Sequence, residues 1–372
     1  MSNDFSKIDT SCNLSGSERS ILSQVLLAGT IPRSGLPALT GITQQAVHKL
    51  CDSLIQRRYL KLGNAKITGR GKPSPRLSIE PASYASAGIS ISTDSIRYCL
   101  LDLAGNPLIE DTEISSMSDP STVAAQLAQR LASWKTDSIP DRTIVGLGVG
   151  MQGFRSGQDD VFLPPEPLVS WADTPLRALF AKHCNLPVFT DNNASISAVA
   201  ENYLGGWERN KCSVFLSFNY GFGAGIYWQG KPFEGGHGNA GEISALFSQE
   251  DLPNRPALGE LIKVLQSNGV AVSSMRQLAA TFDPNLPGLK DWLDRVRPTM
   301  HSAVRALQAT VDPEVIFFGG EAPLELRTLL IEISNAAFHD PRLPIPELLP
   351  SKLEGDPAHL GAALLPLHQL IY

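Results

Sequence analysis

The chain has 372 residues and a formal net charge of −6 at pH 7, with 42% hydrophobic and 18% charged residues. This length suits two or three domains, and this composition is typical of a soluble globular protein rather than a disordered or membrane protein. No run of the sequence approaches the ~20 consecutive apolar residues that span a bilayer.

The N-terminus and the cysteines indicate the compartment. The first residues lack the basic segment and apolar run that mark a signal peptide. The 5 cysteines are scattered, without a Cys-x-x-Cys spacing. We therefore expect a cytoplasmic protein with reduced thiols, no membrane partner and no cysteine-based metal site.

The two parts of the chain differ in charge. Residues 1–80 contain 11 Lys and Arg against 5 Asp and Glu, a balance of +6, whereas the remainder has a balance of −12. A basic segment joined to an acidic body favours nucleic-acid contact through the N-terminal part only.

The N-terminal part begins with residues 1–16, whose polar composition predicts a flexible leader. A first helix should begin near Ser17 and end at Gly29. A second, short helix is expected over residues 33–40. Gly41 then supplies the permissive backbone that a tight turn between helices needs.

The third helix should begin after Thr43 as N-cap and run to about Gln56. Apolar residues at helical spacing should pack the third helix onto the first two: Ala46, Val47, Leu50 and Leu54. On the second helix, Leu36 and Leu39 are expected to face inward toward the same core.

The opposite face of the third helix is polar near its N-terminal half. Glutamine can bind the edge of adenine, and lysine can bind guanine or a phosphate. A solvated helix face is the alternative, but the preceding helix, the glycine turn and a following wing favour DNA contact. The candidate DNA-binding residues here are Arg33, Thr43, Gln44, Gln45, His48 and Lys49.

Two short strand patterns, at residues 59–62 and 76–79, flank a glycine-containing basic loop. Arg70 and Lys72 in this loop can lie along phosphates or enter a minor groove, although an exposed basic hairpin is the alternative. Residues 17–80 therefore predict a winged helix-turn-helix domain.

Residues 81–372 show strands alternating with helices in two successive sets. Strand patterns fall at 87–92, 98–103, 143–149, 187–190, 213–218, 225–228 and 314–318, and helical patterns at 121–134, 176–183, 194–203 and across much of 257–311. This alternation predicts an α/β body of two lobes around a cleft, about 84–190 and 191–372. Whether the C-terminal helix returns to the first lobe stays open.

Several spaced motifs, taken together, resemble the ROK family (repressors, open reading frames and kinases), specifically its repressor branch. The resemblance covers about residues 17–372. It implies an N-terminal winged helix-turn-helix, a body of the sugar-kinase/Hsp70/actin type with a ligand cleft between its lobes, and a homodimer or tetramer. The motifs are Thr40-Gly-Ile-Thr43, Gly69-Arg-Gly-Lys-Pro73, Asp191-Asn-Asn-Ala194, Gly221-Phe-Gly-Ala-Gly225, Gly238-Asn-Ala-Gly-Glu242 and Ile316-Phe-Phe-Gly-Gly320.

The departures from this family concern catalysis. Asn193 stands where the family kinases carry the Asp that takes a proton from the sugar hydroxyl, and an amide cannot act as that base. An alignment that gives the role to Asp191 stays open. The stretch Ser90–Asp94 replaces the family's Asp-x-Gly-Gly-Thr phosphate loop. We therefore expect no catalytic residue, and the surviving Gly221–Gly225 loop is better explained as an inherited tight turn.

The family's zinc and sugar ligands are also reduced. Ala245 takes the place of the zinc-binding His, and residues 250–257 lack the three cysteines, so neither a metal nor a cofactor is expected. Gly259 takes the place of the second sugar-binding Glu, and Pro167 that of an Asn. The candidate effector-binding residues are Asn192, Asn193, His237 and Glu242, although Glu242 could instead serve as an N-cap or a buried turn acceptor.

The sequence therefore predicts a transcriptional regulator, a repressor of carbohydrate-related genes, that binds double-stranded operator DNA. Its operator affinity would change when a sugar or sugar derivative enters the cleft between the lobes. Two alternatives stay open: an ATP-dependent sugar kinase, and a regulator controlled by a protein partner without a small-molecule effector.

Overall fold

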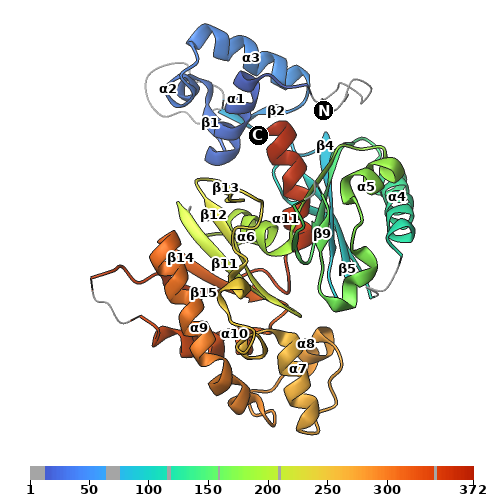
Figure 1. Ribbon diagram of the computed structural model, residues 1–372. Coiled ribbons are helices and arrows are strands. Elements are labelled where there is room, and N and C mark those ends of the chain that lie inside the picture. The colour runs from blue at the N-terminus through green and yellow to red at the C-terminus, as the bar shows by residue number, and fades with distance from the viewer. Residues whose placement is uncertain (1–12, 64–75, 115–118, 158–159, 208–210, 339–341) are drawn as a thin grey trace.

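The computed structural model describes residues 13–63, 76–114, 119–157, 160–207, 211–338 and 342–372. Most of the predicted leader, and the loop that holds Arg70 and Lys72, lie outside the described residues. The described chain forms an N-terminal domain and a mixed α/β body built around two five-stranded sheets (Figure 1). Within it, no helix has both the length and the apolar character needed to cross a membrane.

The N-terminal domain packs three helices on a small antiparallel sheet of strand order β1-β3-β2. Ser15 and Glu18 form a reciprocal capping box, which fixes the start of the first helix just before the predicted residue. The elements are α1 (Gly16–Ala28), β1 (Ile31–Pro32), α2 (Leu36–Thr40), α3 (Gln44–Gln56), β2 (Leu60–Gly63) and β3 (Arg76–Ile79).

The second helix differs from its prediction. Residues Arg33–Gly35 form a 3-10 turn, and only Leu36–Thr40 are α-helical. The change in helix type rotates the face that follows, so Leu36 is buried whereas Leu39 is 54% exposed. The prediction that Leu39 faces inward was wrong.

The third helix agrees closely with its prediction. Thr43 is its N-cap and accepts a hydrogen bond from the Ala46 amide. Val47 and Leu54 are buried, and Cys51 joins them in the same core. The polar residues of the opposite face, Gln44, Gln45, His48 and Lys49, are all exposed.

The first lobe contains a mixed sheet of strand order β10-β7-β4-β5-β6, in which β4, β7 and β10 are parallel neighbours. A two-stranded hairpin, β8 (Phe154–Arg155) with β9 (Phe162–Leu163), follows β7. The other elements are β4 (Tyr84–Ile91), β5 (Ile96–Asp102), β6 (Pro107–Glu113), α4 (Pro120–Asp137), β7 (Thr143–Met151), α5 (Leu176–Cys184) and β10 (Val188–Asn192).

The second lobe has the sheet order β13-β12-β11-β14-β15, with helices α7 to α10 around its core. Its strands are β11 (Cys212–Phe218), β12 (Phe222–Trp228), β13 (Lys231–Pro232), β14 (Val315–Gly320) and β15 (Glu347–Pro350). Its helices are α7 (Leu258–Ser267), α8 (Met275–Thr281), α9 (Leu289–Val311) and α10 (Leu324–Asn335).

Two helices lie between the sheets and pack on each other: α6 (Asn193–Leu204) against β11 and β12, and α11 (Ala358–Pro366) against β4 and β7. A Cβ added to Gly148 would overlap the Ala362 carbonyl oxygen, so α11 sits directly on the backbone of β7. The C-terminal helix therefore belongs to the packing of the first lobe.

The chain end after α11 holds the N-terminal domain. Figure 1 shows α11 running from between the lobes to the N-terminal domain. One hydrophobic cluster combines Leu22 of α1 with Leu101 of β5 and Ile371. The Arg19 guanidinium donates to the carbonyls of His368 (3.2 Å) and Gln369 (2.6 Å). The N-terminal domain is thus docked on the body through a shared core.

Candidate functional site

A cavity of about 220 Å³ lies between the lobes, at the end of β7 and the start of α6. We call it the amide cavity, because Gln152, Asn192, Asn193 and Asn219 line it. Glu242 lines it as well. His237 is exposed and is not among its lining residues. The structure therefore brings three of the four predicted effector-binding residues together.

Asn193 is the most constrained residue of this cavity. It begins α6, is only 2% exposed, and donates through Nδ2 to the Ile91 carbonyl (3.0 Å) and to Ser92 Oγ (3.3 Å). Its Oδ1 is buried without a hydrogen-bond partner. A buried acceptor of this kind is costly unless a donor reaches it.

Glu242 presents a carboxylate with few partners. Its contact with the described side chains is a long hydrogen bond from Asn192 Nδ2 to Oε1 (3.4 Å). Burial raises the pKa of the Glu242 carboxyl. The residue precedes a 3-10 turn at Ile243–Leu246 but makes no capping hydrogen bond there. The N-cap role that the sequence left open is therefore not fulfilled.

Asp191, the alternative catalytic residue, has structural partners instead. It is 3% exposed, lies 3.3 Å from the Arg155 guanidinium and accepts from the Asn192 amide. Burial raises the pKa of its carboxyl to about 6, against the opposing charge of Arg155. Asp191 does not line the amide cavity. The geometry thus gives it no access to a ligand there.

Asp94 and Gly225, from the two loops that the resemblance relates to phosphate binding, have structural contacts in this chain. Asp94 Oδ2 accepts from the backbone amide of Met275 (2.5 Å), and so ties the β4–β5 turn to the start of α8. A Cβ on Gly225 would overlap the Ala194 carbonyl oxygen, so this glycine allows β12 to pack on α6. Close packing thus accounts for Gly225, whereas Gly221 and Gly223 of the same loop line the amide cavity.

Among the described residues, no group of three or more His, Cys, Asp or Glu side chains is arranged to hold a metal ion. The region around Ala245 and residues 250–257 forms 3-10 turns and connecting loops. The absence of a metal ligand there stays a prediction.

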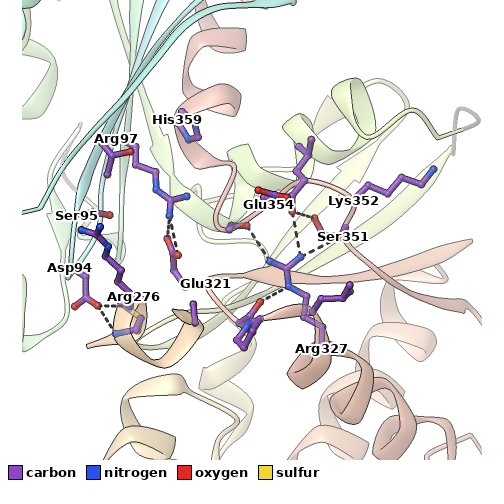
Figure 2. Close-up of a pocket in the computed structure, with 18 of the residues that line it drawn as sticks. Asp94, Ser95, Arg97, Arg276, Glu321, Arg327, Ser351, Lys352, Glu354 and His359 are labelled. Carbon is purple, nitrogen blue, oxygen red and sulfur yellow. Dashed lines mark hydrogen bonds and ion pairs between the residues drawn. The ribbon is translucent and has the colours of Figure 1, made fainter. Parts of the chain in front are cut away.

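A second cavity, of about 1260 Å³, lies between β5 and β6 of the first lobe and the ends of β14 and β15 (Figure 2). We call it the arginine cavity. Arg97 spans the lobes there: it pairs with Glu321 at 2.8 Å and donates to the Asp356 carbonyl at 2.8 Å. Its residues come from distant segments without any local motif, and sequence reasoning missed it.

Arg327 stabilises the wall of the arginine cavity. Figure 2 shows its guanidinium among backbone carbonyls, with Gly320 accepting at 2.7 Å and Ser351 at 3.2 Å. This holds the end of β14 against the segment that leads into α11. Burial lowers the pKa of Arg327.

Some of the predicted DNA-binding residues contact other side chains of the protein, and others have no such contact. Gln44, Gln45 and Lys49 are exposed on α3, and the structure gives their side chains no partner among the described residues. Arg33 is engaged: it pairs with Asp52 at 2.9 Å and contacts His48 Nδ1 at 3.3 Å. Thr43 serves as the helix cap. The free donors and acceptors are thus concentrated in the first turns of α3.

Comparisons with known proteins found a family match and similar sequences. Residues 86–248 match the family model described as "ROK family". The chain is 27% identical to the xylose repressor of Caldicellulosiruptor bescii over 60% of this chain and 56% of that protein. The matched part therefore covers less than two thirds of that repressor.

Solved structures show the same fold. A ROK family transcriptional regulator, a homologue of the E. coli MLC protein, superposes with a TM-score of 0.72 at 19% identity, over 95% of this chain and 96% of that one. The ROK hexokinase from Thermus thermophilus superposes with a TM-score of 0.59 at 22% identity, over 75% of this chain and 97% of that one.

Proposed function

We propose that the chain is a DNA-binding transcriptional regulator of the ROK family that represses carbohydrate-related genes. A sugar or sugar derivative in the amide cavity would change its affinity for operator DNA. The observation that carries this proposal is the free polar face of α3 on a docked winged helix. The body also contains a cleft between its lobes that has an amide, Asn193, where the resemblance places the catalytic Asp.

The cleft favours binding without turnover. Asn193 can hydrogen-bond a hydroxyl but cannot take its proton. Asp191 is buried beside Arg155, away from the cavity. The β4–β5 turn carries Asp94 in a capping role instead of a glycine phosphate loop. We therefore infer that the protein is not an enzyme, although kinases share its fold.

A chain of contacts joins the amide cavity to the N-terminal domain. Asn219 lines the cavity and donates to Asp356 Oδ2 (2.7 Å), whose Oδ1 accepts from the Ala358 amide at the start of α11 (3.1 Å). The far end of α11 leads to the carbonyls that Arg19 binds. A ligand that binds one lobe arrangement better would thus shift the position of α11 and the DNA-binding domain.

We further infer that the protein is cytoplasmic and forms a homodimer or tetramer. Its operators should then be palindromic, because two helix-turn-helix domains related by two-fold symmetry bind two half-sites related by the same symmetry. Selection of bound duplexes from a random library tests the proposal. Enrichment of an inverted repeat is expected. Recovery of no common sequence would refute it.

A sugar-dependent ADP-release assay on the same preparation separates the two family activities. Hexoses, pentoses and amino sugars with Mg²⁺-ATP should give no ADP above the rate without sugar. Sustained turnover would show that the protein is a sugar kinase. Loss of that turnover in Asp191→Ala would identify Asp191 as the general base.

A further inference from the structure

Two charged side chains line the amide cavity, Glu242 and Arg255. Glu242 receives one long hydrogen bond from an amide. Arg255 is half-buried, and among the described residues its side chain has neither an ion pair nor a hydrogen bond. A cation that lines a cavity without a protein partner favours an anionic group in the ligand.

The remaining polar groups favour hydroxyls. Asn193 Oδ1 is buried without a donor, and the Glu242 carboxylate can accept further hydrogen bonds. The Glu242 carboxylate lines the cavity and can accept donors that the cavity wall does not supply. Hydroxyl groups of a sugar are donors of the required kind.

The lining of the cavity carries little negative charge. At Gly259, where the resemblance places a second carboxylate, an added Cβ would lie 2.9 Å from the Tyr220 carbonyl oxygen. No larger side chain fits there without a shift of the backbone. Arg255 therefore faces a cavity whose lining contains one carboxyl group, and burial raises the pKa of that carboxyl.

We infer that the amide cavity binds a polyhydroxylated ligand of monosaccharide size that carries a carboxylate or phosphate, with Arg255 binding the anion. Asn193 and Glu242 bind hydroxyls of the same molecule. This inference rests on the proposed function, in which the cavity holds the effector. The volume of about 220 Å³ suits a single sugar unit better than an oligosaccharide.

Isothermal titration calorimetry on the full chain at low salt tests this inference with two matched series. The first is D-glucose, D-glucuronate and D-glucose 6-phosphate, and the second is the corresponding galactose compounds. At least one acid should bind ten-fold or more tightly than its neutral parent. The uronate and the phosphate distinguish the two anionic groups.

Three variants assign the preference to its residue. Arg255→Gln should abolish the difference between acid and neutral parent, whereas Glu242→Gln should weaken binding and keep that difference. Arg276→Gln is the matched control, because Arg276 is exposed and lines only the arginine cavity. Circular dichroism confirms that each variant is folded.

Equal binding of acids and neutral sugars, a preference that survives Arg255→Gln, or no binding in either series would overturn the inference. Operator binding by the same preparation without ligand decides the proposed function separately. If the protein selects an operator but shows no preference for anionic ligands, the proposed function stands and the inferred ligand class is wrong.

Discussion

Removal of the Arg19 guanidinium should loosen the docking of the N-terminal domain. This side chain belongs to α1, and its two acceptors belong to the chain end beyond α11. It lies outside the predicted DNA-reading face of α3. Arg19→Ala therefore perturbs the attachment of the domain without changing the residues proposed to contact DNA.

The magnitude follows from two charge-assisted hydrogen bonds. Such bonds contribute about 1.5–3 kcal/mol each when buried. One of the two is exposed, and both use the same nitrogen, so a net effect of about 1–2 kcal/mol is appropriate. That energy increases the undocked population roughly 5- to 30-fold.

Hydrogen–deuterium exchange followed by mass spectrometry measures this change. Peptides that span residues 98–103 and 367–372 should exchange faster in Arg19→Ala, because docking buries both segments. A peptide from α7 should exchange at the wild-type rate. Arg295→Ala, an exposed arginine of α9, is the matched control. Unchanged exchange at 98–103 and 367–372 would refute the docking account.

Four further substitutions test other parts of the account. Asp191→Asn should reduce the dependence of the free energy of unfolding on pH. Burial raises the pKa of the Asp191 carboxyl to about 6 in the folded state, so the wild type loses stability as pH rises from about 4 to 6. Urea titrations across this range should show a smaller loss in Asp191→Asn than in the wild type, because burial also raises the pKa of the Glu242 and Glu321 carboxyls, which both proteins keep. Gly148→Ala should destabilise by about 3 kcal/mol or more, measured as the urea midpoint, since the added Cβ overlaps α11. Asn193→Asp should cost about 1–3 kcal/mol at pH 7, because a carboxylate cannot donate to Ile91, and should yield no ADP with sugars. Lys72→Ala should weaken binding to all duplexes and reduce the salt slope by about 1 in anisotropy titrations.

The sequence allowed the prediction of features set by local rules. The Thr43 cap and the buried face of α3 depend on spacing within one helix, and both agree with the structure. The strand patterns of the body likewise correspond to observed strands, with ends displaced by a few residues. The burial of Leu39 was predicted wrongly because residues Arg33–Gly35 form a 3-10 turn. This turn changes which face of the following helix points inward, and the short segment has no sequence pattern that predicts it.

Features that depend on tertiary contacts lay beyond the sequence. The engagement of Arg33 by Asp52 joins residues in different helices, and no spacing rule connects them. The exposure of His237 depends on the path of a glycine-containing loop. The arginine cavity and the docked chain end both unite segments separated by hundreds of residues. Only the folded arrangement brings these groups together.

The most direct test of the central claim is the affinity ratio between a selected operator duplex and a scrambled duplex of the same composition at physiological salt. Fluorescence anisotropy should give a ratio of about 10³ or more for the wild type. Gln45→Ala, on the free face of α3, should lower the ratio and relax preference at one base position, at a cost of about 1–3 kcal/mol. Equal affinity of the wild type for both duplexes would contradict the assignment as a sequence-specific regulator.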